Sequence, residues 1–331
     1  MKRAQIALFL LGLAALATLT VYAGAGAVLR ALVTVRIEGL LVITATHLPS
    51  VALLALAWWL IGRDVTQASL RKFLWARFLR DATAEVLPFS QAGGFAFGVR
   101  ALHLRGVKLL PAALSMSIDL VVELWAKIPY IAAGLLVLLF VAPASQLVRA
   151  LAAALVLTII VASVPVLFRG RLWNGMKALA TRLAGRWPEI GVPTHDEIEE
   201  AFAPMLARRD RLFAAFGVHL FGWFYGAFET WVILAFMGLR VGTGEAVAID
   251  SLVSALRTFA FLVPAAAGVQ EASYVLICGI FGLPPAVGVA VSFARRARDI
   301  LLGAPTFAVW QILEASARPA SPADVPVSRR R

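Results

Sequence analysis

The chain has 331 residues, of which 61% are hydrophobic and 15% are charged, and its formal net charge is +12. A soluble domain needs more charge on its surface, so this composition excludes one and indicates a polytopic α-helical membrane protein. The basic residues lie between the apolar runs and are not interleaved with exposed aromatic residues. This distribution argues against nucleic-acid binding, and we expect no nucleic-acid partner.

Six apolar runs are each long enough to span about 30 Å of hydrocarbon as a helix. They cover residues 6–29, 40–61, 109–141, 147–168, 212–238 and 285–312. Most lysines and arginines fall on one side of the resulting topology, while the outer loops keep Arg30, Arg36 and Arg240. This asymmetry follows the positive-inside rule and predicts that the N- and C-termini are both cytoplasmic.

The N-terminal apolar run allows an alternative interpretation. Lys2 and Arg3, an apolar run and an A-x-A-like site at 23–25 are also typical of a cleaved signal peptide. The run is longer than a usual signal-peptide core, which favours an uncleaved span.

Residues 63–86 and 171–187 are predicted to be helices lying at the inner membrane interface, with a solvated linker as the alternative for 171–187.

A proline and glycine pattern occurs twice within apolar sequence. The two copies are Leu87-Pro88-Phe89-Ser90-Gln91-Ala92-Gly93-Gly94 and Val263-Pro264-Ala265-Ala266-Ala267-Gly268-Val269-Gln270-Glu271. Pro264 lies 176 residues after Pro88. The same offset superposes Asp119 on Arg295 and Glu123 on Asp299, so the chain is internally duplicated.

The two copies predict where the helices are broken. Proline and glycine interrupt helices, and broken backbone at membrane depth is tolerated only where it is buried in protein or lines a cavity. In the charge-based topology the copies enter the membrane from opposite faces, and paired interruptions of this kind point to a transporter's binding site.

We therefore predict a single membrane domain over 1–331. It comprises about six transmembrane helices and two re-entrant, Pro/Gly-broken units, related as inverted repeats at about 64–141 and 240–314. A basic cytoplasmic tail follows at 315–331. The topology depends on residues 245–262, because a full span there would place the C-terminus outside.

Ionisable residues within the membrane are the candidate binding residues, since inserting each costs about 2.5–3.5 kcal/mol. This set is Asp119, Glu123, Arg257, Glu271, Arg295, Arg296, Arg298 and Asp299, with Gln91 as a possible donor to a headgroup. The breaks at Pro88, Gly93, Gly94, Pro264 and Gly268 are predicted to line the cavity. Arginines in such a place suit a lipid phosphate, with carboxylates that balance charge or carry protons.

The same residues also have structural interpretations. The charged set can form an ion-pair network that holds the two repeats together, and Glu123 can pair with Lys127 one turn away. Glu271 can cap the free N–H groups of a broken helix or pair with an arginine. Arg257 can extend to the interface, and His219 among aromatic residues is expected to be a packing residue.

Motifs of known catalytic sites are not found in the sequence. It contains no phosphate-binding loop, no H-E-x-x-H, no G-x-S-x-G and no Cys/His spacing typical of a metal site. The single cysteine, Cys278, excludes an internal disulfide. We predict no catalytic residue, no metal and no cofactor.

The second motif carries a family resemblance. Pro264-x-x-x-Gly268-x-x-Glu271, then Gly282, then Arg295-Arg296 resembles the C-terminal signature of the lysylphosphatidylglycerol synthase transmembrane-region family. The first motif, with Glu85 before it, is similar to the branch found with hopanoid-biosynthesis genes. The resemblance covers roughly residues 5–315 and implies a multi-pass protein of the bacterial inner membrane that moves a lipid between leaflets.

Two departures from the family pattern bear on function. Alanines occupy 265–267 where the family often has glycines, which makes the second break stiffer, and Phe95 stands where relatives often have an acidic residue. The aminoacyl-transferase domain of the two-domain relatives is missing, so this chain is not expected to make lysyl-lipid.

The function expected from this resemblance is translocation of a polar, anionic or hopanoid-related lipid. The expected partners are that lipid and, as a further candidate, lipid-synthesis enzymes. An intramembrane lipid-modifying transferase and a non-transporting scaffold of a lipid-synthesis complex are the alternatives.

Overall fold

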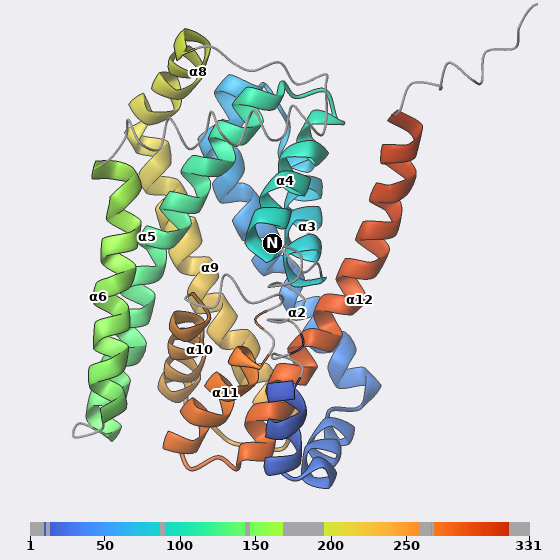
Figure 1. Cartoon of the computed structure of the whole chain (residues 1–331), viewed down its shortest axis with the longest axis vertical. Helices are drawn as coiled ribbons and strands as arrows, with labels where there is room; N and C mark the ends of the chain where they lie inside the picture. Colours follow the sequence, from blue (N-terminus) through green and yellow to red (C-terminus); the bar gives the residue numbers. More distant parts are fainter. Residues whose placement is uncertain are drawn as a thin grey trace, which may run out of the picture.

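The computed structural model describes residues 10, 14–86, 90–142, 146–167, 195–258, 266 and 268–317, and these form helices without any strand (Figure 1). Pro88, Pro264, the segment 171–187 and most of the 315–331 tail lie outside the described residues, as does the side chain of Gln91. An all-α architecture was expected from the apolar runs, and it is confirmed.

The structure describes ten of these helices with their bounds. They are α2 (Ala25–Thr66), α3 (Leu70–Val86), α4 (Ser90–His103), α5 (Leu109–Val141), α6 (Gln146–Leu167), α8 (His195–Ala207), α9 (Arg209–Phe236), α10 (Thr243–Thr258), α11 (Val269–Ile280) and α12 (Pro285–Ala317). Of the described helices, α2 and α5 are long and apolar enough to cross a membrane by length and composition. Helices α9 and α12 are also long but carry polar and charged residues along their length.

The first two expected spans are joined differently from the prediction. The sequence predicts a loop around Arg30 and Arg36 between spans at 6–29 and 40–61. Instead, helix α2 extends from Ala25 to Thr66, and its direction changes at Arg36, where φ is 56° and ψ is 174°. A single residue with left-handed φ is enough to redirect a helix, so no separate loop is needed.

The two predicted repeats contain the same succession of helices. Helix α5 covers 109–141 and α12 covers 285–317, which is the same interval moved by 176 residues. Each follows a turn glycine with positive φ, 83° at Gly106 and 72° at Gly282. In Figure 1 the α3–α4 pair lies in the upper half and the α10–α11 pair in the lower half, while α5 and α12 run in opposite directions. Entry of the two units from opposite membrane faces stays a prediction.

Each helical pair also has an apolar core of its own. The larger core surrounds α10 and α11 and includes Ile249, Leu252 and Ile277, whereas Phe73 and Leu102 belong to a core around α3 and α4. Helix α10 has 16 residues and is therefore only about 24 Å long, too short to cross the hydrocarbon alone. It packs against α5, α9 and α11.

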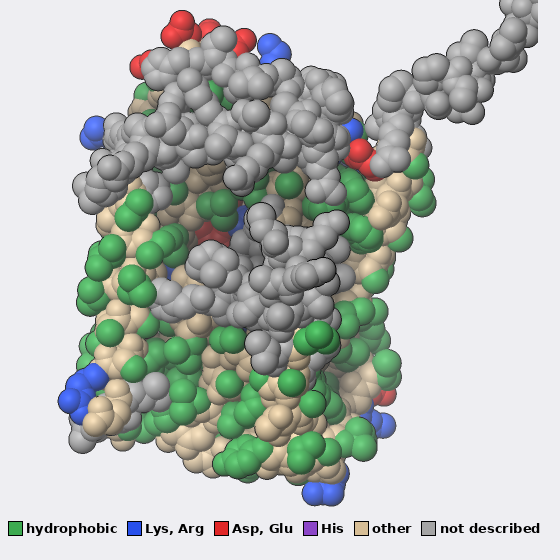
Figure 2. Space-filling view, viewed as in Figure 1, with side chains coloured by type: hydrophobic (Ala, Val, Ile, Leu, Met, Phe, Trp, Pro, Cys, Tyr) green, Lys and Arg blue, Asp and Glu red, His purple; other side chains and the backbone are tan. Residues whose placement is uncertain are grey.

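Helix α3, within the segment 63–86 that is predicted to lie at the inner membrane interface, is part of the helical bundle. It packs against α4, α12 and α2, and its Arg77 and Arg80 side chains are buried in the bundle. The outer surface is apolar instead: Phe140 is 89% exposed and Phe213 is 75% exposed. Figure 2 shows hydrophobic side chains over the sides of this face and charged side chains near its ends, with a hollow in the middle that exposes acidic and basic groups.

Close packing of α12 on α11 depends on a glycine, and this gives a first prediction. A Cβ at Gly288 would lie 2.7 Å from the backbone nitrogen of Val275. Because the contact is with backbone, Gly288→Ala must push the two helices apart, at a cost of at least about 1–3 kcal/mol. We expect a lower thermal unfolding midpoint and less monodisperse protein on size exclusion in detergent.

Gly279→Ala on α11 is the matched control, since a Cβ at Gly279 would meet no atom within 4 Å. An equal loss of stability in both variants would contradict close packing at Gly288.

Candidate functional site

A first buried charge network links α3 to α5 and α9. Arg80 donates to Asp119 at 3.4 Å and to Glu123 at 3.1 Å. Arg77 binds Glu123 at 3.4 Å and Asp81 at 2.9 Å. The spacing of three or four residues places these groups on facing sides of α3 and α5. His219 of α9 completes the network, with its Nε2 at 2.9 Å from Asp119 Oδ1.

The second network links α12 to α9 and α10. Arg295 pairs with Asp250, whose carboxylate also accepts hydrogen bonds from Thr230 at 2.6 Å and from Tyr130 at 2.7 Å. Three partners thus hold one buried carboxylate of α10, as the burial of charge requires.

Arg298, one turn after Arg295, extends this network towards α2. It pairs with Glu229 of α9 and with Asp299 beside it. His47 of α2 lies 2.9 Å from the other oxygen of Glu229. His47 and Glu229 therefore belong to the polar interior, although neither residue stands out in the sequence.

Glu271 caps helix α11 and pairs with an arginine, which are the two structural roles considered for it from the sequence. Its Oε2 accepts from the backbone N–H of Gly268 at 2.8 Å and so caps α11. Its Oε1 accepts from Ser292 at 2.6 Å and from Arg296 at 2.8 Å. The carboxylate is completely buried, and both oxygens are used.

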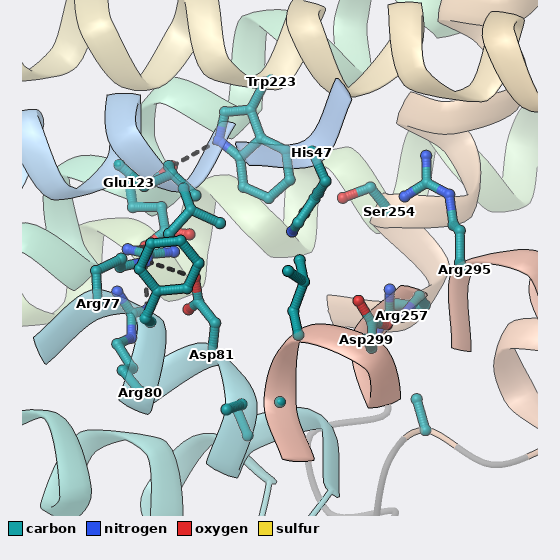
Figure 3. Close-up of a pocket in the computed structure, with 18 of the residues that line it drawn as sticks. His47, Arg77, Arg80, Asp81, Glu123, Trp223, Ser254, Arg257, Arg295 and Asp299 are labelled. Atoms are coloured by element: carbon teal, nitrogen blue, oxygen red, sulfur yellow. Dashed lines mark hydrogen bonds and ion pairs between the residues drawn. The ribbon is translucent and has the colours of Figure 1, made fainter. Parts of the chain in front are cut away.

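A cavity of about 500 Å³ lies between the two networks. Figure 3 shows Arg77, Arg80, Asp81 and Glu123 on one side of this space and Ser254, Arg257, Arg295 and Asp299 on the other, with His47 and Trp223 between them. The charged lining comprises six basic side chains (Arg77, Arg80, Lys127, Arg257, Arg295 and Arg298) and three acidic ones (Asp81, Glu123 and Asp299). The carboxylates of Asp119, Asp250 and Glu229 bind these arginines without lining the cavity. The side chains that face the cavity are therefore mainly basic, and carboxylates behind the wall balance part of their charge.

The structure brings together part of the predicted set. Five of its members line the cavity, namely Glu123, Arg257, Arg295, Arg298 and Asp299. Asp119 lies behind this wall, while Glu271 and Arg296 form a separate pair. Gly94 does not line the cavity as predicted, because it lets α4 approach α3: a Cβ there would be 2.8 Å from the Arg80 carbonyl oxygen. Gly93 and Gly268 are also absent from the lining, but Ala266, within the second break, is part of it.

The sequence prediction missed several members of the site. Arg77 and Arg80 were counted among the cytoplasmic charges, although their spacing relative to Asp81 along a helix was a signal. Asp250 had a clearer signal as an acidic residue within an apolar stretch. The pairing of Glu123 with Lys127, which their spacing allowed, is not used: Glu123 binds two arginines and Lys127 binds Thr258 at 2.8 Å.

Asp119, Glu123 and His219 are close enough to hold a cation, with ligand atoms within 4.8 Å of one another. However, Arg77 and Arg80 already bind both carboxylates. A metal ion would have to displace two guanidinium groups from a buried site. The donor set therefore fits ion pairing better than metal binding.

The buried network gives a second prediction. Asp119→Asn removes a carboxylate that is 0% exposed, so the buried Arg80 guanidinium loses one of its negatively charged partners. Breaking a buried ion pair costs about 3–5 kcal/mol, so thermal unfolding in detergent should shift strongly downward. The control is Glu38→Gln, which breaks an exposed pair with Arg36 and should cost about 0–1 kcal/mol. Equal shifts would show that the Asp119 network contributes little to stability.

Comparison with protein families identifies the chain. The family described as "Lysylphosphatidylglycerol synthase TM region" matches residues 6–304. Neither the comparison with curated proteins nor that with solved structures found a match. The family match and the long apolar helices place the protein in a membrane, and the motifs around Pro264 and Arg295 resemble the signature of the same family. The chain belongs to the lysylphosphatidylglycerol synthase transmembrane-region family.

Proposed function

We propose that this protein moves a lipid with an anionic headgroup between the leaflets of the bacterial inner membrane. The observation that carries the proposal is the cavity of about 500 Å³ within an apolar bundle, whose charged lining is mainly basic. A headgroup could enter this polar space while its acyl chains stay among the lipids. The family, whose members include lipid flippase domains, supports a role in lipid handling.

The chemistry of the wall favours an anion. Arginine presents planar donors that match the oxygens of a phosphate, and such charge-assisted bonds are stronger than neutral ones. In the cavity these arginines already bind carboxylates, as Arg80 does with Glu123 and Arg295 with Asp250. A phosphate that takes a carboxylate's place at one of these arginines would keep the guanidinium paired, and the displaced carboxylate would then need a proton or another cation as its partner.

The location of these ion pairs supports movement of the headgroup. One network ties α3 to α5 and the other ties α12 to α10, so the cavity wall is built from both repeat units. A bound anion that competes for Arg80 or Arg295 would loosen one of these ties. Alternate loosening of the two ties would expose the headgroup first to one side and then to the other.

The orientation and lipid class are also part of the proposal. The distribution of lysine and arginine supports cytoplasmic termini, and the first motif makes hopanoid-related lipids the second class to test. No feature of the described residues favours a catalytic role, and recovery of chemically unchanged lipid would separate transport from a transferase activity.

The test is leaflet accessibility in liposomes that contain the purified protein and a fluorescent phospholipid. We expect the protein to remove the fraction protected from dithionite faster for phosphatidylglycerol than for phosphatidylcholine, because the wall is basic. Lack of acceleration for every anionic headgroup would contradict the proposal and favour a scaffold.

Blocking the cavity provides a variant for the same assay. Ala82 lines the cavity, so Ala82→Trp should fill part of it and return transfer to the protein-free rate. Leu136→Trp is the matched control, because Leu136 is 57% exposed on the apolar surface. If Ala82→Trp transports as fast as wild type, this cavity is not the path.

A further inference from the structure

Lys127 differs from the arginines of the cavity wall in its partners. Arg77, Arg80, Arg295 and Arg298 each pair with at least one carboxylate. The Lys127 ammonium instead donates to the Thr258 hydroxyl at 2.8 Å and lies 4.6 Å from the centre of the Trp223 ring. Within the part of the chain that the structure describes, no carboxylate is within ion-pair distance of Lys127.

The nearest acidic side chain along α5 is already occupied. Glu123 precedes Lys127 by one turn, but its Oε2 binds Arg77 at 3.4 Å and Arg80 at 3.1 Å. Within the described residues, the direct partners of the Lys127 ammonium are therefore a neutral hydroxyl and an aromatic ring. A cation removed from water without a counter-ion is costly, and an aromatic ring offsets only part of that cost.

The hydrogen bonds of Lys127 leave room for a ligand. An ammonium group has three donors, and Thr258 accepts one of them. The Thr258 hydroxyl in turn donates to the carbonyl oxygen of Ser254 at 2.9 Å, so its lone pairs are directed to Lys127. Lys127, Trp223, Ser254 and Thr258 all line the cavity, and Figure 3 shows Trp223 and Ser254 directed into the same space.

We propose that Lys127 binds the phosphate group of a phospholipid headgroup, and that Thr258 and Trp223 hold its ammonium in place until the lipid arrives. The inference rests on the proposed function and names the residue that selects the ligand's charge. A phosphate would supply the counter-ion that the described surroundings of Lys127 lack. The arginines of the wall can then keep their carboxylate partners during the first contact.

The experiment measures binding rather than transport. Purified protein in a non-ionic detergent is titrated calorimetrically with dihexanoyl phosphatidylglycerol, glycerol 3-phosphate and inorganic phosphate. The variants are Lys127→Gln, which keeps a donor for Thr258 but loses the charge, and Lys127→Arg, which keeps the charge. The control is Lys72→Gln, because Lys72 also donates to a neutral oxygen, that of Arg105 at 2.7 Å, but is exposed outside the cavity.

We expect wild type, Lys127→Arg and Lys72→Gln to bind dihexanoyl phosphatidylglycerol with similar affinity. Lys127→Gln should bind it at least tenfold more weakly, a loss of about 1.4 kcal/mol. The two water-soluble phosphates should bind more weakly than the lipid. If Lys127→Gln is not monodisperse, the double variant Lys127→Met with Thr258→Val replaces it, since it removes both polar partners together.

Unchanged affinity for the lipid in Lys127→Gln would overturn the role of Lys127. If the wild-type protein still binds and transports the lipid in that case, the proposed function stands. Equal affinity for inorganic phosphate and the lipid would overturn the assignment to a lipid headgroup. If wild type binds none of the three probes, the phosphate site is wrong, and the liposome assay then decides separately whether any lipid is moved.

Discussion

The structure depends on the pairing of charges that are buried in an apolar bundle. An ion that leaves water loses several kcal/mol of hydration, and only close partners restore it. Asp119 and Glu271, both completely buried, show how this is met: the first binds Arg80 and His219, and the second binds Arg296 and a helix N-terminus. The helices that carry these groups are therefore fixed relative to one another by polar contacts as well as by apolar packing.

The predicted duplication relates the two charge networks to each other. Asp119 of α5 binds Arg80 of α3, and the residue at the equivalent position of α12, Arg295, binds Asp250 of α10. The third helix of each unit is thus tied to the first by an ion pair, but the acidic and basic partners are exchanged. In both units the arginine of the pair lines the cavity, while Asp119 and Asp250 bind it from behind.

The cavity wall contains arginines that are already paired and one lysine whose partners are neutral. The arginines of its wall are neutralised by carboxylates, several of which lie behind them, so the bundle can persist without a bound anion. Lys127 is held by Thr258 and the Trp223 ring instead, which are weaker partners for a buried cation. The structure therefore contains both the fixed pairs that shape the site and a cation whose partners can be replaced.

The sequence by itself determined the helical class, the apolar runs and the family motif, and it predicts the duplication, because all of these follow from local composition and spacing. It also identified Glu123, Arg295 and Arg298 of the cavity wall as charges in apolar surroundings. Only the tertiary structure decided which charges meet. Arg80 and Asp119 are 39 residues apart and Arg298 and Glu229 are 69 apart, and such distances carry no local signal of contact. Burial decided the rest: Arg80 has the sequence context of an interfacial residue and becomes part of the site only because α3 packs inside the bundle.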